Sequence, residues 1–565
     1  MIVDISNTEP VQAYKRVLFL FAISTILFIP ALIKGIPSSN DLPHHYRVVT
    51  SFAEAIHSGV YYPNWNALST GGYGDVSFRF YPPGAYFFLS FTKALTGDWF
   101  YGSLLAFVLF AAVGGLGVYF WARDFLCPNL SLLAGVLYII APFHVNEIYQ
   151  AFLMPEYAGS AILPFCFAFV TRVCRDGRKR DIAGLAATFG LLILTHLPLA
   201  VIASFALVGY ALLLIRRDSA VRTVLQLSAA ALLGLAASAR YWMMMVSEFH
   251  WLKSWTMDWY DYQYNFVFGK TVEGSTSWWA NVLAVITVLF FLPGFIFLCR
   301  RSQERSATTL RRVALLAIVS FVMATPISKP FWMILPGLKE VQFPWRWLVV
   351  TSMAGAMVLA ASMEFWRDKF RGKGRPLTLI AAGCLLVPCG VTVSQTIRGA
   401  TFIPRARFES LTSTIARTES ISYWRPTWAA ESIRPMNGPL ELTNRSSSNI
   451  NWGYTKRSFE VEAGPEQEAR IRTFYYPHWI ASAEGVRLQT RPSDDGALLI
   501  SIPDRKLRVE LEFVEPRLIR VAGFISLVAW LLIGGMGLGR FRLRLFSSKI
   551  ALVQSGDAVD GVRRT

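Results

Sequence analysis

The chain has 565 residues, a net charge of +18 at neutral pH, and hydrophobic residues at 53% of its positions. Long uncharged runs recur from Val17 to Leu538, which is more apolar sequence than a soluble core needs, so composition predicts an integral membrane protein with many spans. The Lys and Arg residues are dispersed beside these runs and form no single patch, which argues against nucleic-acid binding as the reason for the basic charge.

The first apolar run, residues 17–34, predicts a membrane-spanning helix. It is long for the core of a cleaved signal peptide, it follows the acidic Asp4 and Glu9, and no A-x-A site comes directly after it. We expect about twelve spans in all, with both ends of the chain on one side. The others fall at residues 102–121, 129–142, 157–171, 182–196, 198–215, 223–245, 277–299, 312–326, 346–364, 377–395 and 517–539.

Loops rich in Lys and Arg set the predicted orientation, because such loops remain in the cytoplasm. They are residues 172–180, 216–222, 300–312, 367–375 and the tail from Arg540. Both termini are then cytoplasmic, and the external stretches are residues 35–101, 143–156, 246–276, 327–345 and 396–516. Residues 195–198 form either a tight hairpin or a kink in one helix, and the parity of the loops favours the hairpin.

The external stretches differ in character. Residues 35–101 predict amphipathic helices on the membrane surface, one of them starting near Pro43. Residues 396–516 contain alternating apolar and polar segments between turns, which predicts a small, self-contained β-rich domain. The expected domains are a transmembrane domain over residues 1–395, this external domain, and a final span with a basic cytoplasmic tail over residues 517–565.

The sequence contains no familiar motif for binding a metal or a nucleotide. The six cysteines lie in the predicted spans or near their cytoplasmic ends, and the seven histidines have no zinc-binding spacing. No Walker, Rossmann or G-x-S-x-G motif occurs in a fitting context. We therefore expect no metal, no cofactor and no disulfide framework.

Four motifs carry a resemblance to a group of membrane proteins. They are Asn40-Asp41-Leu42-Pro43-His44-His45, Arg79-Phe80-Tyr81-Pro82-Pro83, Gln342-Phe343-Pro344-Trp345-Arg346-Trp347 and Tyr475-Tyr476-Pro477-His478-Trp479. With the layout of spans and loops, they resemble the membrane glycosyltransferases of the GT-C superfamily and a bacterial group of GT-C-like proteins, including YfhO-type proteins and proteins labelled 6-pyruvoyl-tetrahydropterin synthase-related. The label fits poorly, because a pterin synthase needs a soluble fold with clustered zinc histidines, and this sequence has neither.

The resemblance implies an enzyme of the bacterial inner membrane that moves a sugar from a polyprenyl-phosphate-linked donor to a lipid, glycan or protein acceptor on the external face. This reaction needs a carboxylate to accept the proton of the acceptor hydroxyl and cations to hold the departing phosphate. Asp41 is the predicted base, because GT-C enzymes commonly place a catalytic Asp or Glu at this point of the first loop. Its alternative role is that of a helix N-cap before Pro43. Asp75 and Glu54 are weaker candidates.

Arg346 and several side chains of the first loop besides Asp41 are expected to bind the substrate. Arg346, at the outer end of a span, is the predicted phosphate ligand, and the alternative is an interfacial Arg in an aromatic belt. Arg47 and Arg79 can share this task, and Tyr81 belongs to the same motif as Arg79. The adjacent His44 and His45 are expected to orient a hydroxyl or to assist proton transfer.

The second and third external loops add polar and aromatic groups at the same face. His144, Glu147 and Glu156 are expected to contact the substrate, and the lack of a D-x-D pair argues against a metal there. The aromatic residues of the third loop stack on a sugar or, more simply, anchor the loop at the interface. These aromatic residues are Trp255, Trp259, Tyr260, Tyr262 and Tyr264.

Two other classes of function remain open besides the enzyme. A polysaccharide or lipid transporter would also have many spans, but no internal repeat of the transporter kind is visible in the sequence. A non-catalytic membrane scaffold would need only the external β-rich domain. In an enzyme, Asp41, Arg79, Glu156 and Arg346 should converge on one outward-facing cavity, and in the other classes they should scatter.

Overall fold

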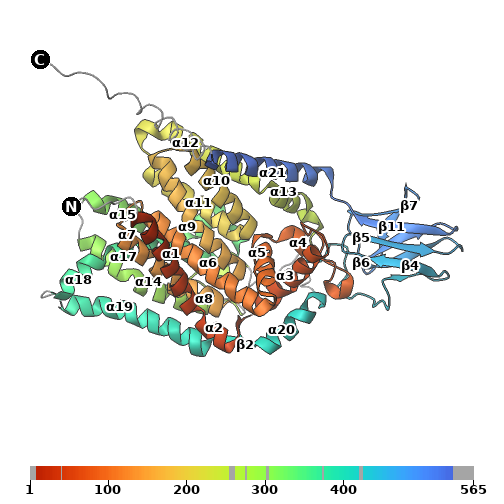
Figure 1. Cartoon of the computed structure of the whole chain (residues 1–565), viewed down its shortest axis with the longest axis horizontal. Coiled ribbons are helices and arrows are strands. Elements are labelled where there is room, and N and C mark those ends of the chain that lie inside the picture. Colours follow the sequence, from red (N-terminus) through yellow and green to blue (C-terminus); the bar gives the residue numbers. More distant parts are fainter. Residues whose placement is uncertain are drawn as a thin grey trace, which may run out of the picture.

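The computed structural model describes residues 8–39, 41–253, 261–273, 277–300, 305–371, 375–418 and 424–538. The helices form an elongated body, and most strands form a smaller β domain that projects from one end of this body (Figure 1). The helical membrane class and the β-rich C-terminal part are thereby confirmed.

Eight described helices are long and apolar enough to cross a membrane, and two bent helix pairs raise this number to ten. The eight are Trp99–Ala122, Pro128–Tyr149, Met154–Arg175, Leu197–Leu214, Arg217–Ala237, Trp278–Arg300, Pro376–Gly399 and Arg517–Gly537. The pairs are Leu310–Met323 with Pro326–Ile334 and Pro344–Ala361 with Met363–Arg371. All ten coincide with predicted spans. Residues 17–34 and 182–196 do not meet this measure, so the number twelve stays a prediction.

The first half of the body contains the helices of the first loop as well as candidate spans. Its helices are α1 (Thr8–Leu27), α2 (Ile29–Lys34), α3 (Asp41–His57), α4 (Ser77–Phe80), α5 (Gly84–Thr96), α6 (Trp99–Ala122), α7 (Pro128–Ile139), α8 (Pro142–Tyr149), α9 (Met154–Arg175), α10 (Lys179–Thr195) and α11 (Leu197–Leu214).

The second half continues through the remaining helices to the end of the described chain. These are α12 (Ala220–Ala237), α13 (Ala239–Glu248), α14 (Ser277–Arg300), α15 (Arg305–Met323), α16 (Lys329–Ile334), α17 (Leu348–Ala361), α18 (Met363–Arg371), α19 (Arg375–Ser394), α20 (Arg405–Thr414) and α21 (Arg517–Leu538). A short 3-10 helix over Pro344–Trp347 leads into α17.

The helices α10 and α11 form a hairpin with His196 at its turn. α10 ends at Thr195, and α11 begins at Leu197. The other ends of the two helices return to one place, because Ile182 near the start of α10 and Arg217 just after α11 line the same surface hollow. The structure therefore has the hairpin that loop parity favoured over a kinked helix.

A short antiparallel strand pair joins the first loop to the segment after α19. β1 (Ile36–Ser38) pairs with β2 (Thr401–Ile403). Gly35 precedes β1 with a φ of 122°, and a Cβ atom at this residue would lie 2.0 Å from the carbonyl oxygen of Ile403. Only glycine fits this backbone conformation and this close approach. The strand pair fixes the chain immediately before α3.

The C-terminal strands form two antiparallel sheets. One has the strand order β4-β5-β11-β7-β8 and the other β3-β6-β10-β9. The strands are β3 (Leu440–Glu441), β4 (Ser447–Trp452), β5 (Lys456–Val461), β6 (Gln467–Phe474), β7 (Trp479–Ala483), β8 (Val486–Arg487), β9 (Thr490–Pro492), β10 (Ala497–Ile502) and β11 (Leu507–Phe513). The predicted segment 396–516 is thus β-rich only from Leu440 onward, because its first part contains β2 and α20.

The apolar core of the β domain includes side chains from the first loop. Trp65, Tyr73, Val76 and Phe80 are buried in the same cluster as the inward-facing residues of both sheets. The backbone N–H of Phe474 in β6 also donates to the carbonyl oxygen of Tyr73 at 2.7 Å. The β domain is therefore built together with the first loop and differs from the self-contained module that alternation suggested.

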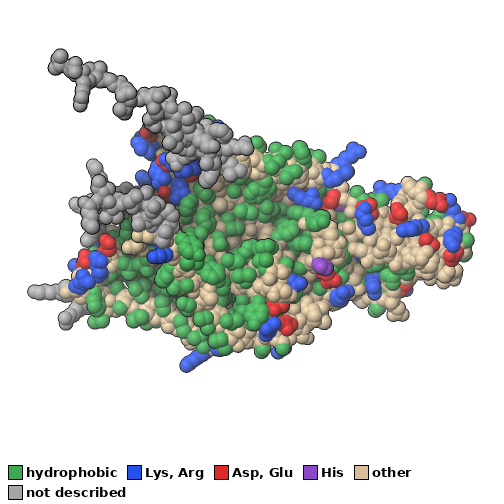
Figure 2. Space-filling model, viewed as in Figure 1, with side chains coloured by type: hydrophobic (Ala, Val, Ile, Leu, Met, Phe, Trp, Pro, Cys, Tyr) green, Lys and Arg blue, Asp and Glu red, His purple; other side chains and the backbone are tan. Residues whose placement is uncertain are grey.

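The surface of the helical body suits a lipid environment. Hydrophobic side chains cover most of its visible face, whereas charged side chains cluster near the ends of the body and on the β domain (Figure 2). The exposed apolar side chains come from helices distant in sequence and include Ile33, Leu212, Leu232, Leu379 and Phe524. In water such a surface would be costly, and in a bilayer it contacts acyl chains.

Candidate functional site

A cavity of about 830 Å³ lies where the first loop meets the start of α9 and the turn before α17. Its charged and polar lining residues are Ser38, Ser39, Asp41, His44, His45, Gln150, Glu156, His196, Gln342 and Arg346. Its aromatic lining residues are Tyr81, Tyr86, Trp279, Phe343, Trp345 and Trp424. The cavity thus combines two carboxylates, one guanidinium and several rings.

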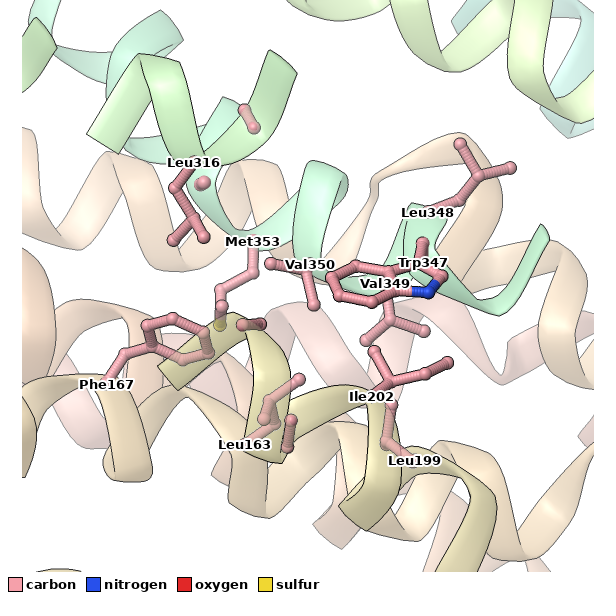
Figure 3. Packing of buried hydrophobic residues seen from close by; sticks show 14 of the residues in the cluster. Leu163, Phe167, Leu199, Ile202, Leu316, Trp347, Leu348, Val349, Val350 and Met353 are labelled. Carbon is pink, nitrogen blue, oxygen red and sulfur yellow. The ribbon is translucent and has the colours of Figure 1, made fainter. Parts of the chain in front are cut away.

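Core packing holds three of these polar residues together. Figure 3 shows side chains of α9, α11 and α17 that point toward one another, with Leu199 and Ile202 of α11 beside Val349. Glu156 lies in the first turn of α9, His196 comes directly before α11, and Arg346 comes just before α17. Because the three helices pack against each other near these ends, their polar residues reach the same cavity.

Arg346 is held by hydrogen bonds and aromatic rings. Its Nε donates to Glu156 Oε2 at 2.8 Å, and its Nη1 donates to the carbonyl oxygen of Val341 at 2.7 Å. The guanidinium carbon lies 4.8 Å from the ring centre of Phe343 and 5.6 Å from that of Trp345. The side chain is therefore fixed in the cavity wall, with its charge facing the cavity and Glu156.

Asp41 is the first residue of α3 and lines the cavity. Burial raises the pKa of Asp41 to about 6, against the opposing effect of the Arg346 charge. Within the described chain, no backbone N–H of α3 donates to its carboxylate, so the capping alternative has no hydrogen bond to support it. At neutral pH such a carboxylate is mostly ionised and a stronger proton acceptor than an ordinary Asp.

His44 and His45 follow Asp41 on the same helix and line the same cavity. Burial lowers the pKa of His45 to about 3, and its Nδ1 lies 3.2 Å from the Tyr86 hydroxyl. Burial, together with the nearby Arg47 charge, also lowers the pKa of His44. Both rings are neutral at physiological pH, so each offers one donor and one acceptor and adds no positive charge.

Three other predicted site residues lie outside the cavity lining. Arg47 donates from Nε to Thr418 Oγ1 at 2.9 Å. His144 stacks between the rings of Tyr138 and Tyr157, with centroid distances of 4.4 Å on both sides, and its Nδ1 lies 2.9 Å from Glu147 Oε2. The His144 and Glu147 pair is fully buried among the helices.

Arg79 also lies apart from the cavity, in a buried ion cluster beneath the β domain. Its Nε donates to Glu248 Oε2 at 2.5 Å, and its Nη1 donates to Glu515 Oε1 at 2.7 Å. Tyr476 donates its hydroxyl to Glu248 at 2.6 Å, and His478 Nε2 lies 2.9 Å from Glu248 Oε1. Of the four residues expected to converge, Asp41, Glu156 and Arg346 do, and Arg79 does not.

In the described part of the chain, the same cluster contains three side chains whose spacing could hold a metal ion. One ligand atom each from Glu248, His478 and Glu515 lies within 4.8 Å of the others. The guanidinium of Arg79 is already paired with both carboxylates and supplies the positive charge there. The cavity residues Asp41 and Glu156 belong to no such group among the described residues.

The remaining candidates have local partners or lie in other places. Asp75 accepts hydrogen bonds from the backbone and hydroxyl of Ser77, and Glu54 lies on an exposed helix face. Tyr262 stacks on Trp332 at 5.5 Å, in the manner of an anchor. Trp255, Trp259 and Tyr260 lie outside the described residues, and Tyr264 does not line the cavity.

Sequence reasoning missed His196, Gln342 and Gln150 as cavity residues. His196 drew attention only as part of the hairpin, and Gln342 only as the first residue of a motif. Gln342 adopts a φ of 68°, which is unusual for a residue other than glycine, and nothing in its sequence context signals this conformation. Each of the three reaches the cavity through packing between helices that are distant along the chain.

Comparison with protein families gave one match. A family profile described as "6-pyruvoyl-tetrahydropterin synthase related domain; membrane protein" matches residues 78–402. This match confirms the resemblance to the pterin-synthase-related membrane proteins that the motifs indicated. A comparison with curated proteins found no match.

Several solved structures are similar to this chain at low sequence identity. ArnT from Cupriavidus metallidurans bound to undecaprenyl phosphate is 17% identical over 71% of this chain and 69% of its own, with a TM-score of 0.44. The Archaeoglobus fulgidus oligosaccharyltransferase in the apo form is 13% identical over 71% of this chain, with a TM-score of 0.41. The mycobacterial arabinofuranosyltransferase AftD is 15% identical over 69% of this chain, with a TM-score of 0.44. The aligned region spans 57% of the archaeal enzyme and 28% of AftD.

Proposed function

The chain belongs to the 6-pyruvoyl-tetrahydropterin synthase related family of membrane proteins, and from its cavity we propose that it is a membrane glycosyltransferase. A pterin synthase would need clustered zinc histidines. Six of the seven histidines lie outside the one metal-like group of the described chain, and Arg79 is already paired with that group. The reaction is proposed from the cavity and not from the family label.

The observation that carries this proposal is the convergence of Asp41, Glu156 and Arg346. They come from three distant parts of the chain and line one cavity of about 830 Å³. Buried charged groups are costly, and their gathering in a cavity is typical of binding and catalytic sites. The aromatic walls suit a sugar, whose apolar faces stack on rings.

In the proposed reaction, Asp41, Arg346 and Glu156 each have a different role. The acceptor hydroxyl oxygen attacks the anomeric carbon of the donor sugar, and the bond between this carbon and the phosphate oxygen breaks. The electron pair leaves with the lipid phosphate, whose negative charge Arg346 stabilises. The hydroxyl proton passes to the Asp41 carboxylate, and Glu156 keeps Arg346 in place through their 2.8 Å hydrogen bond.

The proposed donor is a polyprenyl-phosphate-linked sugar. The cavity lies near the ends of candidate spans, where the phosphate of a lipid anchored in the bilayer is within reach. The acceptor is a lipid, glycan or protein. We place the cavity and the β domain on the external face of a bacterial inner membrane, with both termini in the cytoplasm, because the basic loops follow the positive-inside rule.

The test is incubation of the purified protein with a panel of polyprenyl-phosphate sugars, with consumption of each donor followed by mass spectrometry. At least one donor should be consumed when a hydroxyl acceptor is present, and Asp41→Asn should consume it at least about 10²-fold more slowly. A well-folded protein that neither binds nor consumes any lipid-phosphate sugar would fit the scaffold and contradict the enzyme. Movement of an intact donor across a vesicle membrane, without bond cleavage, would favour the transporter.

A further inference from the structure

His196 occupies an unusual position between α10 and α11. Its backbone is extended, with φ −154° and ψ 103°, and it is the N-cap residue of α11. The backbone N–H of Leu199 donates to Nδ1 of its ring at 3.3 Å. The residue is only 4% exposed, yet it lines the cavity that contains Asp41 and Arg346. One side of the ring thus caps a helix, and the residue faces the cavity.

The capping hydrogen bond determines where the ring proton sits. A ring nitrogen that accepts a hydrogen bond carries no proton, and an imidazolium ring donates from both nitrogens. Nδ1 of His196 is therefore unprotonated, and the ring is neutral with its proton on Nε2. In this tautomer Nε2–H is a hydrogen-bond donor of fixed direction.

This donor and one nitrogen of Arg346 have no partner among the described residues. Arg346 uses Nε for Glu156 and Nη1 for the carbonyl oxygen of Val341, which leaves Nη2. His196 uses Nδ1 for the cap, which leaves Nε2. The two side chains line the same cavity, and the Arg346 charge is close enough to act on the ring. Two such donors suit an anionic oxygen.

We propose that His196 binds the phosphate of the lipid-linked donor through Nε2–H, together with Nη2 of Arg346. This role rests on the proposed function. A ligand oxygen in the cavity would accept a hydrogen bond from a donor that has no partner among the described residues. A neutral donor beside Arg346 also adds an interaction with the phosphate without a second cation that would repel the guanidinium.

The helix cap alone gives no reason for histidine. Asn, Asp, Ser and Thr are the preferred N-cap residues, and their short side chains reach the same backbone N–H groups. A short side chain would leave the place of Nε2 empty. The substitution His196→Asn therefore separates the two roles, because the amide oxygen keeps the cap and the distant donor is lost.

The experiment measures binding of polyprenyl phosphate without a sugar, and the thermal unfolding midpoint, for the parent, His196→Asn and His57→Asn. His57 is an exposed histidine outside the cavity and serves as the control. His196→Asn should bind the lipid phosphate about 10-fold or more weakly, as expected for a lost hydrogen bond to a charged group, with the midpoint unchanged. His57→Asn should match the parent in both measurements.

The outcomes distinguish this role from the proposed function. If the parent binds and His196→Asn binds equally well, the phosphate role of His196 is wrong while the glycosyltransferase proposal stands. If the parent binds no lipid phosphate, the proposed function fails and the role of His196 fails with it. If His196→Asn does not fold, His196→Ser takes its place, because the Ser hydroxyl also caps the helix.

Discussion

Asp41 and Glu156 are two carboxylates in one cavity with different surroundings. The Glu156 carboxylate is tied to Arg346 at 2.8 Å, whereas that of Asp41 has no hydrogen-bond partner among the described residues. Protonation of Glu156 would weaken its ion pair with Arg346, whereas protonation of Asp41 breaks no hydrogen bond among the described residues. We therefore assign proton transfer to Asp41 and the positioning of Arg346 to Glu156.

The first prediction concerns Asp41→Asn. This substitution keeps the size of the side chain but removes the proton acceptor, so the rate of sugar transfer should fall by about 10²-fold or more. The affinity for the donor should stay nearly the same, because the phosphate contacts are elsewhere in the cavity. Single-turnover transfer and donor binding are measured on the same preparation. Glu54→Gln, on the exposed face of the same helix, is the matched control and should keep full activity.

Arg346→Ala should give a different pattern, in which donor binding is also weakened. It removes a charge-assisted contact to the donor phosphate, so donor affinity should fall along with the transfer rate. It also leaves Glu156 buried without its cation, so the thermal unfolding midpoint must be measured alongside. Equal losses of donor affinity in Asp41→Asn and Arg346→Ala would contradict the division of roles.

The second prediction is the pH dependence of transfer. A base must be ionised to accept a proton, and burial raises the pKa of Asp41 to about 6. The transfer rate should therefore be constant above this pH and fall about 10-fold for each unit below it. A pH profile at saturating donor measures this limb. In Asp41→Asn the limb should disappear, and its persistence would assign the ionisation to another group.

At the scale of elements, the sequence predicts best what depends on local pattern. Ten predicted spans coincide with candidate membrane helices, because an apolar run of sufficient length is a local signal. Alternation within residues 396–516 predicted β strands for the same reason, and β11 is one of them. The pairing of β1 with β2 was not predicted, because it joins residues 36–38 to residues 401–403 and each strand is very short.

The third prediction tests this strand pair through Gly35→Ala. The added Cβ atom would lie 2.0 Å from the carbonyl oxygen of Ile403, and the φ of 122° is itself unfavourable for alanine. The variant should lose roughly 1–3 kcal/mol of stability, measured by thermal unfolding in detergent. Gly59→Ala is the control, because Gly59 has a φ of 90° but no atom within 4 Å of the new Cβ. Equal losses in both variants would mean that the contact with Ile403 is unimportant.

At the scale of the whole molecule, long-range partners decide which residues form the site. Asp41 and Arg346 were predicted as site residues from the motifs that resemble GT-C-like proteins. Both residues line the same cavity. Arg79 belongs to one of those motifs as well, but it pairs with Glu248 and Glu515, which are 169 and 436 residues away in sequence. No local pattern reveals such partners, and composition alone cannot separate a buried structural arginine from a phosphate ligand.

The fourth prediction concerns orientation in the membrane. Reporter fusions after Gly269 and Asn451 should read as external, and a fusion after Gly177 should read as cytoplasmic, because the basic loops remain inside. Alkaline phosphatase and green fluorescent protein fusions give complementary signals on the two faces. Because the β domain shares a core with the first loop, a cytoplasmic signal at Asn451 would also place the cavity on the cytoplasmic side.

The last prediction concerns the ion cluster that joins the β domain to the helical body. Arg79→Met removes the cation between Glu248 and Glu515 but keeps most of the side-chain volume. Loss of one partner from a buried ion pair typically costs about 3–5 kcal/mol, so thermal stability should fall clearly. Burial alone would raise the pKa of Glu248, but hydrogen bonds from His478 and Arg79 lower it to about 2.

Because the folded-state pKa of Glu248 lies below the ordinary value of 4.5, its stabilising effect is fully present above that pH and is lost as the pH falls toward about 2. The difference in stability between the parent and Arg79→Met should therefore shrink over this range. Hydrogen exchange should show the loosening in the β domain and the first loop before the spans. Arg417→Met, which removes an exposed arginine, is the control and should cost less than about 1 kcal/mol. A fully stable Arg79→Met protein with unchanged exchange would mean that the shared apolar core alone holds the two parts together.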